Sequence, residues 1–246
     1  MKKIFVLFIA LSVLCGTLVF SETLDQILKK NYESRGGLKK LKQVKSFLFE
    51  GKMIIPMQGM EFPVKIWQKK PNFVRIEASV MEKMVIQAYN GKIAWWIMPF
   101  MGVNDPAEMP ENEGKEVIQQ AESFDPLVDY KEKGHKLEFV GKEDMEGTEV
   151  FKLKLTEKDG RIVFFFLETD SCIEIKTATY IKRGEAENLV ESFLGDYKEV
   201  EGIMFPFSVE SKMNGNMVTK MAIESVKLNE KMDNSLFEMP AKKTAE

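Results

Sequence analysis

The sequence predicts a mainly β protein, with roughly eleven strands in one antiparallel sheet that curls toward a barrel. Three observations support this prediction. Apolar and polar residues alternate with a period of two along most of the chain after Val44. Turn pairs that begin at Asn90, Asp159 and Asn214, each followed by glycine, indicate tight hairpins. No regular alternation of strands and helices indicates a parallel sheet.

The first 21 residues have the pattern of a secretory signal peptide. Lys2 and Lys3 precede an apolar run that reaches Phe20, and Ser21 is a small residue at the expected cleavage point. We therefore expect cleavage before Glu22 and a periplasmic protein. An uncleaved anchor helix and a lipid-anchored form acylated at Cys15 are the alternatives.

Composition limits the function classes. The 246-residue chain has a formal net charge of −3 and no basic stripe, so nucleic acid is a poor partner. After cleavage Cys172 is the only cysteine, which excludes an intramolecular disulfide. We predict one domain over residues 22–240, a frayed tail over 241–246 and a monomer.

A short N-terminal helix begins the predicted domain. Thr23 and Gln26 have capping-box spacing, and the helix is expected to stop at Gly36 and Gly37. Its apolar residues recur at helical intervals, and they are Leu24, Ile27, Leu28 and Tyr32. A basic turn, LKKLKQ, is expected to lead into the first strand.

The first run of strands alternates clearly. One side is expected to carry Phe47, Phe49, Met53 and Ile55, then Phe62, Val64 and Ile66, then Val74, Ile76, Ala78 and Val80. Between Asn104 and Lys136 the chain is polar and rich in proline, and we predict two short helices there. Asp125 before Pro126 is expected to cap the second of them. Seven more strands follow.

Catalytic and metal-binding signals are weak. His135 is the only histidine, so it cannot complete a zinc set, and Cys172 is expected on a solvated strand face with Glu174 and Lys176. No phosphate-binding glycine loop or nucleophile elbow is found. We predict no cofactor, no metal and no enzymatic activity.

An excess of methionine and aromatic residues indicates a hydrophobic ligand. The chain has 16 methionines and 18 phenylalanines, and methionine adapts to ligands of variable shape. If three short helices cover the concave side incompletely, part of its lining is left for an acyl chain. The predicted lining residues are Phe47, Phe49, Ile66, Val74, Ile76, Ile86, Trp96, Phe164, Phe166, Phe207 and Met221.

Residues 69–100 resemble the LolA-like family of periplasmic outer-membrane lipoprotein carriers. The shared pattern is a basic residue before Pro71-Asn72, an alternating strand, Asn90-Gly91-Lys92, Trp95 and Pro99-Phe100. Further similar segments lie at 33–42, 196–206 and 233–240. The resemblance implies an incomplete β-barrel with helices as a lid over a hydrophobic cavity.

The resemblance also implies a lid contact at Lys70, where the family has an arginine. Lysine lacks the planar fork of arginine, so closure is expected to differ. The other predicted lid residues are Val117, Ile118, Phe124 and Leu127. Of the adjacent tryptophans, Trp96 is expected inside and Trp95 outside, because neighbouring strand residues face opposite sides.

The leading hypothesis is a carrier for the acyl chains of lipoproteins or for another lipid, with an inner-membrane donor and an outer-membrane acceptor as partners. An envelope sensor or interaction module with the same fold is the alternative. An enzyme that uses His135 and Cys172 ranks last.

Overall fold

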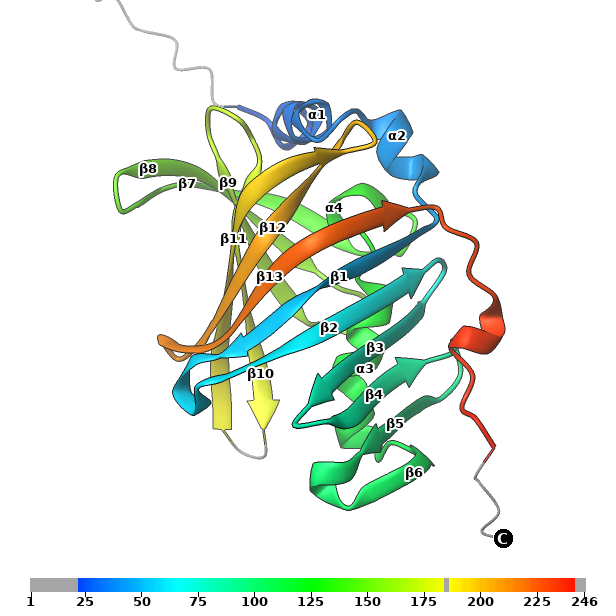
Figure 1. Ribbon diagram of the computed structural model, residues 1–246. Helices are drawn as coiled ribbons and strands as arrows, with labels where there is room; N and C mark the ends of the chain where they lie inside the picture. Colours follow the sequence, from blue (N-terminus) through cyan, green and yellow to red (C-terminus); the bar gives the residue numbers. More distant parts are fainter. Residues whose placement is uncertain (1–21, 184–185, 242–246) are drawn as a thin grey trace, which may run out of the picture.

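The computed structural model describes residues 22–183 and 186–241, and the expected signal peptide lies outside them. A single antiparallel sheet dominates the fold (Figure 1). Its strands are β1 (Ser46–Ile55), β2 (Met60–Lys69), β3 (Phe73–Val80), β4 (Lys83–Tyr89), β5 (Ala94–Met98), β6 (Val103–Glu108), β7 (Lys136–Met145), β8 (Thr148–Thr156), β9 (Ile162–Glu168), β10 (Glu174–Arg183), β11 (Ala186–Val200), β12 (Ile203–Met213) and β13 (Asn216–Leu228).

The sheet has 13 strands in the order β6-β5-β4-β3-β2-β1-β13-β12-β11-β10-β9-β8-β7. Strands β6 and β7 each have one partner among the described residues, so the sheet curls without closing. The predicted incomplete barrel is therefore confirmed. The prediction missed β6, because its sequence is polar and contains Pro106, which an edge strand tolerates.

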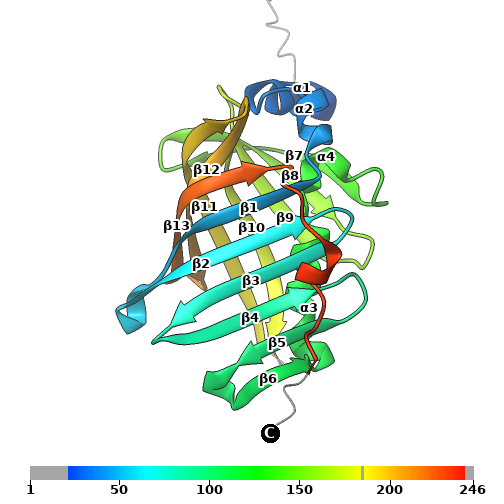
Figure 2. The same cartoon turned by 45° about the vertical axis from the view of Figure 1, so that its right-hand side comes forward.

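The helices are α1 (Leu24–Ser34), α2 (Leu38–Gln43), α3 (Glu111–Glu122) and α4 (Pro126–Asp129). Figure 2 shows α1 and α2 at one end of the sheet and α3 behind β3–β5. Thr23 and Gln26 form the predicted capping box, and Gly36 and Gly37 follow α1 with positive φ. The segment LKKLKQ is helix α2 instead of a turn, because Leu41 anchors it in the core.

We call the sheet face that packs against α1, α3 and α4 the inner face, and the opposite face the outer face. Three apolar clusters join the inner face to the helices, one below each helical region. No helix among the described residues is long and apolar enough to cross a membrane.

The C-terminal segment packs on the outer face of β1–β5, as the red trace in Figure 2 shows. Phe237 is fully buried against Leu48 and Met232, and its carbonyl oxygen accepts a hydrogen bond of 2.7 Å from Trp95 Nε1. Trp95 therefore lies on the outer face, where this segment covers it. Trp96 points to the α3 side together with Ala94.

Replacing Phe237 with alanine is expected to lower the free energy of unfolding by about 3–5 kcal/mol, because a fully buried ring leaves a cavity. Urea unfolding followed by tryptophan fluorescence measures this change. Met57→Ala is the control, since Met57 is 79% exposed and its loss should cost less than about 0.5 kcal/mol. Equal effects of the two substitutions would contradict the docking of the C-terminal segment.

Candidate functional site

The inner face holds eight of the eleven predicted lining residues. Strand pairing sets Phe49 opposite Ile66, and Ile66 opposite Ile76, so their side chains share a face. The eight residues on the inner face are Phe47, Phe49, Ile66, Val74, Ile76, Trp96, Phe207 and Met221. Whether they bind a ligand stays a prediction.

The other three predicted lining residues lie on the outer face. Ile86 packs with Ala88 and Trp95 under the C-terminal segment. Phe164 and Phe166 pack with Val150 and Ala178, away from α1 and α4. The prediction was wrong for Ile86, Phe164 and Phe166, because these strands are apolar on both faces and the pattern alone does not fix which face is inside.

Several inner residues of β8 and β9 were missed. Phe151, Leu153, Phe165 and Leu167 are 3% exposed or less and pack against α1 and α4. The signal was present in FKLKL, where two lysines alternate with the apolar residues of β8. Because Leu153 pairs with Phe165, this alternation also assigns the middle phenylalanine of the run to the inner face.

The predicted lid residues lie over the inner face. Val117 and Ile118 of α3 pack in the cluster that contains Val64 and Ala94. The ring of Phe124 lies 4.8 Å from that of Phe47, measured between centroids. Leu127 of α4 is fully buried in the cluster below α1. Movement of these helices as a lid stays a prediction.

Polar side chains fix the helices to one end of the sheet. Gln68 Nε2 donates a hydrogen bond of 2.7 Å to the carbonyl oxygen of Gln120 in α3. Lys70 Nζ lies 2.7 Å from Asp129 Oδ2 in α4 and 4.8 Å from the centroid of the Phe124 ring. Lys70 thus contacts the lid at the expected place through a single ammonium group.

A buried charged cluster joins α1 to α4. Arg35 donates to both carboxylate oxygens of Asp125, at 3.0 and 2.8 Å, and lies 3.7 Å from Glu174 Oε1. Asp125 was predicted to cap α4 with its side chain. It makes no such bond, because the carboxylate is engaged by Arg35.

The charges in this cluster affect one another. Burial lowers the pKa of Arg35, but the carboxylates of Asp125 and Glu174 outweigh that effect and raise it. Burial raises the pKa of Glu174, Arg35 opposes this change, and repulsion from Asp125 adds to it. The guanidinium therefore stays charged, and folding disfavours the ionised form of Glu174 relative to the unfolded chain.

A small pocket lies between this cluster and the inner face. It has a volume of about 160 Å³, and its walls combine aromatic rings with the charged cluster. The lining residues are Arg35, Leu41, Val44, Phe47, Phe49, Phe124, Asp125, Pro126, Glu174 and Phe205. This volume is below the roughly 300 Å³ at which pockets for drug-sized ligands begin. An elongated apolar group can insert only its end unless the lid helices move.

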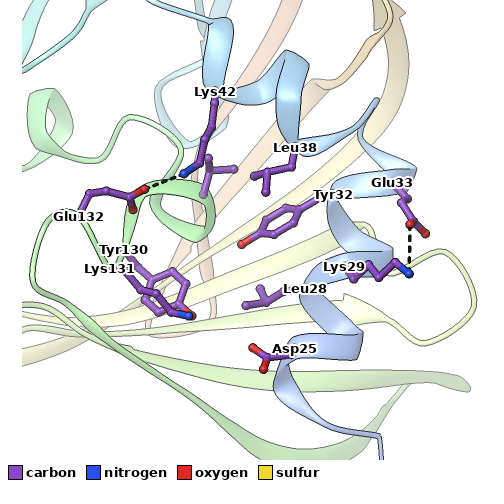
Figure 3. Close-up of a pocket in the computed structure, with 11 residues that line it drawn as sticks. Asp25, Leu28, Lys29, Tyr32, Glu33, Leu38, Lys42, Tyr130, Lys131 and Glu132 are labelled. Carbon is purple, nitrogen blue, oxygen red and sulfur yellow. Dashed lines mark hydrogen bonds and ion pairs between the residues drawn. The ribbon is translucent and has the colours of Figure 1, made fainter.

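A larger pocket of about 470 Å³ lies outside the inner face, between α1, α2 and the segment after α4 (Figure 3). Tyr32 and Tyr130 form its apolar floor, while ion pairs such as Lys42–Glu132, at 2.7 Å, stand at its edge. Tyr32 also donates a hydrogen bond of 2.8 Å to the carbonyl oxygen of Leu127. The pocket is an open cleft with walls of mixed charge.

The two residues considered for catalysis, His135 and Cys172, take part in local hydrogen bonding and core packing. His135 Nδ1 accepts a hydrogen bond from the backbone N–H of Lys158, at 3.2 Å. Cys172 is fully buried against α1, so the prediction of a solvated face was wrong, and burial raises the pKa of its thiol. Among residues 22–183 and 186–241, no group of three or more His, Cys, Asp and Glu side chains is placed to hold a metal ion.

Three solved structures share this fold over most of the chain. A LolA superfamily protein from Nitrosomonas europaea matches with a TM-score of 0.60 and 14% identity, over 89% of this chain and 98% of that one. A putative outer membrane lipoprotein-sorting protein domain from Vibrio parahaemolyticus gives 0.55 and 10%, over 86% and 94%. A DUF1329 family protein from Desulfovibrio piger gives 0.57 and 12%, over 86% and 97%.

The resemblance inferred from the sequence is thus confirmed for the fold, which is LolA-like. No protein-family model and no curated protein matches the sequence.

Asp125→Asn is expected to destabilise the protein by about 3 kcal/mol, because it leaves the buried charge of Arg35 without its bidentate partner. Urea unfolding at pH 7 measures the change. Asp105→Asn, at an exposed position in β6, is the control and should leave the unfolding midpoint unchanged. A midpoint equal to that of the wild type would contradict the role of the pair.

Glu174→Gln is expected to do the opposite at neutral pH. Because the pKa of Glu174 is raised in the folded state, ionisation costs stability at pH 7, and glutamine removes that cost. The advantage should shrink as the pH falls through the raised pKa of the folded protein, and it should be absent below about 4.3, where the carboxyl group is protonated in the unfolded chain as well. A variant that is less stable than the wild type at pH 7 would contradict this assignment.

Proposed function

We propose that the protein is a periplasmic carrier that binds acyl chains, of lipoproteins or of another lipid, between its inner face and its lid helices. The observation that carries the proposal is the aromatic pocket between Phe47, Phe49, Phe124 and Phe205, which lies at the junction of sheet and lid. The LolA-like fold supports the same class of ligand.

An acyl chain suits these walls because it needs no directed polar contact. Each buried methylene group contributes about 0.8 kcal/mol, so even a part of one chain provides useful affinity. The rings of Phe47 and Phe49 are tilted against each other with centroids 4.6 Å apart, and the centroid of the Phe205 ring lies 6.1 Å from that of Phe49. The apolar walls thus select for hydrophobicity rather than for a head group.

Full occupancy requires displacement of the lid. The pocket of about 160 Å³ widens only if Phe124 leaves the ring of Phe47, and Phe124 lies directly between α3 and α4. The segment is held by charged contacts at Lys70–Asp129 and Arg35–Asp125. Opening therefore has to break these charged contacts together with the packing of Phe124 on Phe47.

Transport follows from this opening. We expect export by the N-terminal signal, uptake of an acyl chain from a donor at the inner membrane, and release to an acceptor with a better apolar groove at the outer membrane. No nucleotide and no bond cleavage are required.

Filling the pocket tests the ligand site. Val44→Phe adds bulk to a pocket wall, and we expect it to weaken binding of a fluorescent fatty acid and of an acylated peptide by about tenfold. Val140→Phe is the matched control, because Val140 is 54% exposed on β7 and outside the pocket. Loss of binding in both variants, or in neither, would count against a site beneath the lid.

Native mass spectrometry of the wild type loaded with the acylated peptide gives an independent readout. One bound chain per protein is expected. Complete failure to take up either ligand would leave the LolA-like fold without the proposed carrier activity.

Loosening the lid tests the opening step. Lys70→Ala removes the ion pair with Asp129 and the contact with the Phe124 ring, so uptake and release of the fatty acid should both become about tenfold faster in stopped-flow fluorescence. Lys65→Ala, which breaks an exposed ion pair with Glu50, should leave both rates unchanged. Unchanged rates in Lys70→Ala would show that this contact does not control the lid.

A further inference from the structure

Exposed apolar side chains gather at one rim of the sheet. Five of the eight large apolar residues exposed in the described chain lie in the β1–β2, β3–β4 and β5–β6 turns or beside them. We call them the apolar rim, and they are Met57, Met81, Met84, Phe100 and Met101, with exposed fractions of 79%, 71%, 48%, 50% and 60%. Figures 1 and 2 both show these three turns along the same side of the sheet.

Charge is nearly absent from the three turns. Residues 54–60 read IIPMQGM and residues 97–103 read IMPFMGV, without a charged side chain in either. Residues 80–84 read VMEKM, in which the negative charge of Glu82 and the positive charge of Lys83 sum to zero. The turns at the opposite ends of the same strands, KKPN at 69–72 and NGK at 90–92, are polar and basic. The two rims of one half-sheet thus differ in chemistry.

The backbone holds the apolar side chains outward. Pro56 and Pro99 each begin a single 3₁₀ turn, which closes when the N–H of Gly59 or Gly102 donates to the proline oxygen at 3.1 Å. Each turn therefore projects its two middle residues into water. A cation–π contact of 5.3 Å between Lys83 Nζ and the Phe100 ring links the second turn to the third.

The β3–β4 turn has a backbone conformation that is unfavourable for its two residues, Met81 and Glu82. Met81 and Glu82 have φ of 47° and 63°, the left-handed region that favours glycine and asparagine. At the β12–β13 turn, two residues suited to this backbone conformation, Asn214 and Gly215, have φ of 49° and 81°. A Met-Glu pair at 81–82 is thus less favourable for this turn than the Asn-Gly pair, and it leaves the methionine 71% exposed.

We propose that the apolar rim docks on a neutral lipid bilayer, with the five side chains inserted at the boundary between head groups and acyl chains. The apolar rim consists of three separate projecting turns, with the polar side chains of Gln58, Glu82 and Lys83 exposed among the apolar ones. It does not offer the continuous surface of roughly 20 residues a side that a stable protein interface uses, so a second copy or a folded partner is a poor fit. Side chains can insert into a bilayer one by one, without a continuous contact surface. Uncharged, flexible and aromatic side chains are suited to the boundary between head groups and acyl chains.

Sedimentation with vesicles tests the inference. The wild type is expected to bind vesicles of phosphatidylcholine, with no gain when phosphatidylglycerol is added and no loss in high salt, because the rim has no net charge. The double variant Met57→Asp/Phe100→Asp should have an affinity for the vesicles that is lower by about tenfold or more. Its thermal midpoint should match that of the wild type, since both residues are exposed.

The matched control is Val140→Asp/Tyr180→Asp, which places the same two charges on exposed apolar residues of β7 and β10, away from the rim. It should bind vesicles like the wild type. Met101→Trp provides a second readout, because its emission should shift to the blue on addition of vesicles. Absence of vesicle binding by the wild type, or equal loss in both double variants, would overturn the inference.

Two further outcomes would also overturn it. Binding that needs phosphatidylglycerol and disappears in salt would indicate surface charge instead of the rim. Self-association in sedimentation velocity that is abolished by Met57→Asp/Phe100→Asp, without vesicle binding, would assign the rim to a second copy.

Docking and cargo binding are separable. Val44→Phe, which blocks the pocket, should leave vesicle binding intact. If the wild type binds vesicles but takes up no acyl chain, the docking inference stands and the proposed carrier function fails. If it takes up acyl chains but does not bind vesicles, the carrier function stands and the docking inference fails.

Discussion

The pairing of β1 with β13 is the constraint on which the structure depends. These central strands pair residues 47–54 with residues 220–228 and unite the two halves of the sheet. Their register skips Glu224, opposite Glu50 and Gly51, and such a bulge bends and twists the sheet. A Cβ atom at position 51 would lie 2.2 Å from the carbonyl oxygen of Ala222, so only glycine allows this approach. Gly51 therefore allows the bulge that bends the sheet where its two halves join.

A curled sheet without closure must cover its inner face with other material. The chain uses short helices, and it fixes them by a mixture of apolar packing and polar contacts. Helix α3 is packed closely enough that a Cβ atom at Gly114 would lie 3.2 Å from that of Ala94. By contrast, the segment at Phe124 and α4 is held through Arg35, Lys70 and Tyr32. Phe124, Leu127 and Val128 of this segment are also buried in apolar clusters, so polar and apolar contacts together hold it beside the aromatic pocket.

The sequence predicted elements whose signal is local. The capping box at Thr23 and the Asn-Gly and Asp-Gly hairpins depend on nearby residues only, and they appear as expected. Predictions failed where packing decides. The three consecutive phenylalanines at 164–166 offer apolar side chains to both faces, so only pairing with β8 distinguishes Phe165. Cys172 and LKKLKQ seemed polar from their neighbours, but α1 covers the cysteine and Leu41 anchors the helix.

Strand β1 connects the two features from which function was inferred. Its inner side carries Phe47, Phe49, Gly51, Met53 and Ile55, an uninterrupted apolar line that starts in the aromatic pocket and ends at the turn that bears Met57. The opposite ends of β2 and β4 are bound to the rest of the chain, since Lys69 bonds to the carbonyl oxygen of Met232 and Asn90 to Glu238. One end of this half-sheet is therefore a fixed support. The other end leaves its apolar side chains to the solvent, and no charged side chain of β1 interrupts the apolar line on this face between the pocket and that end.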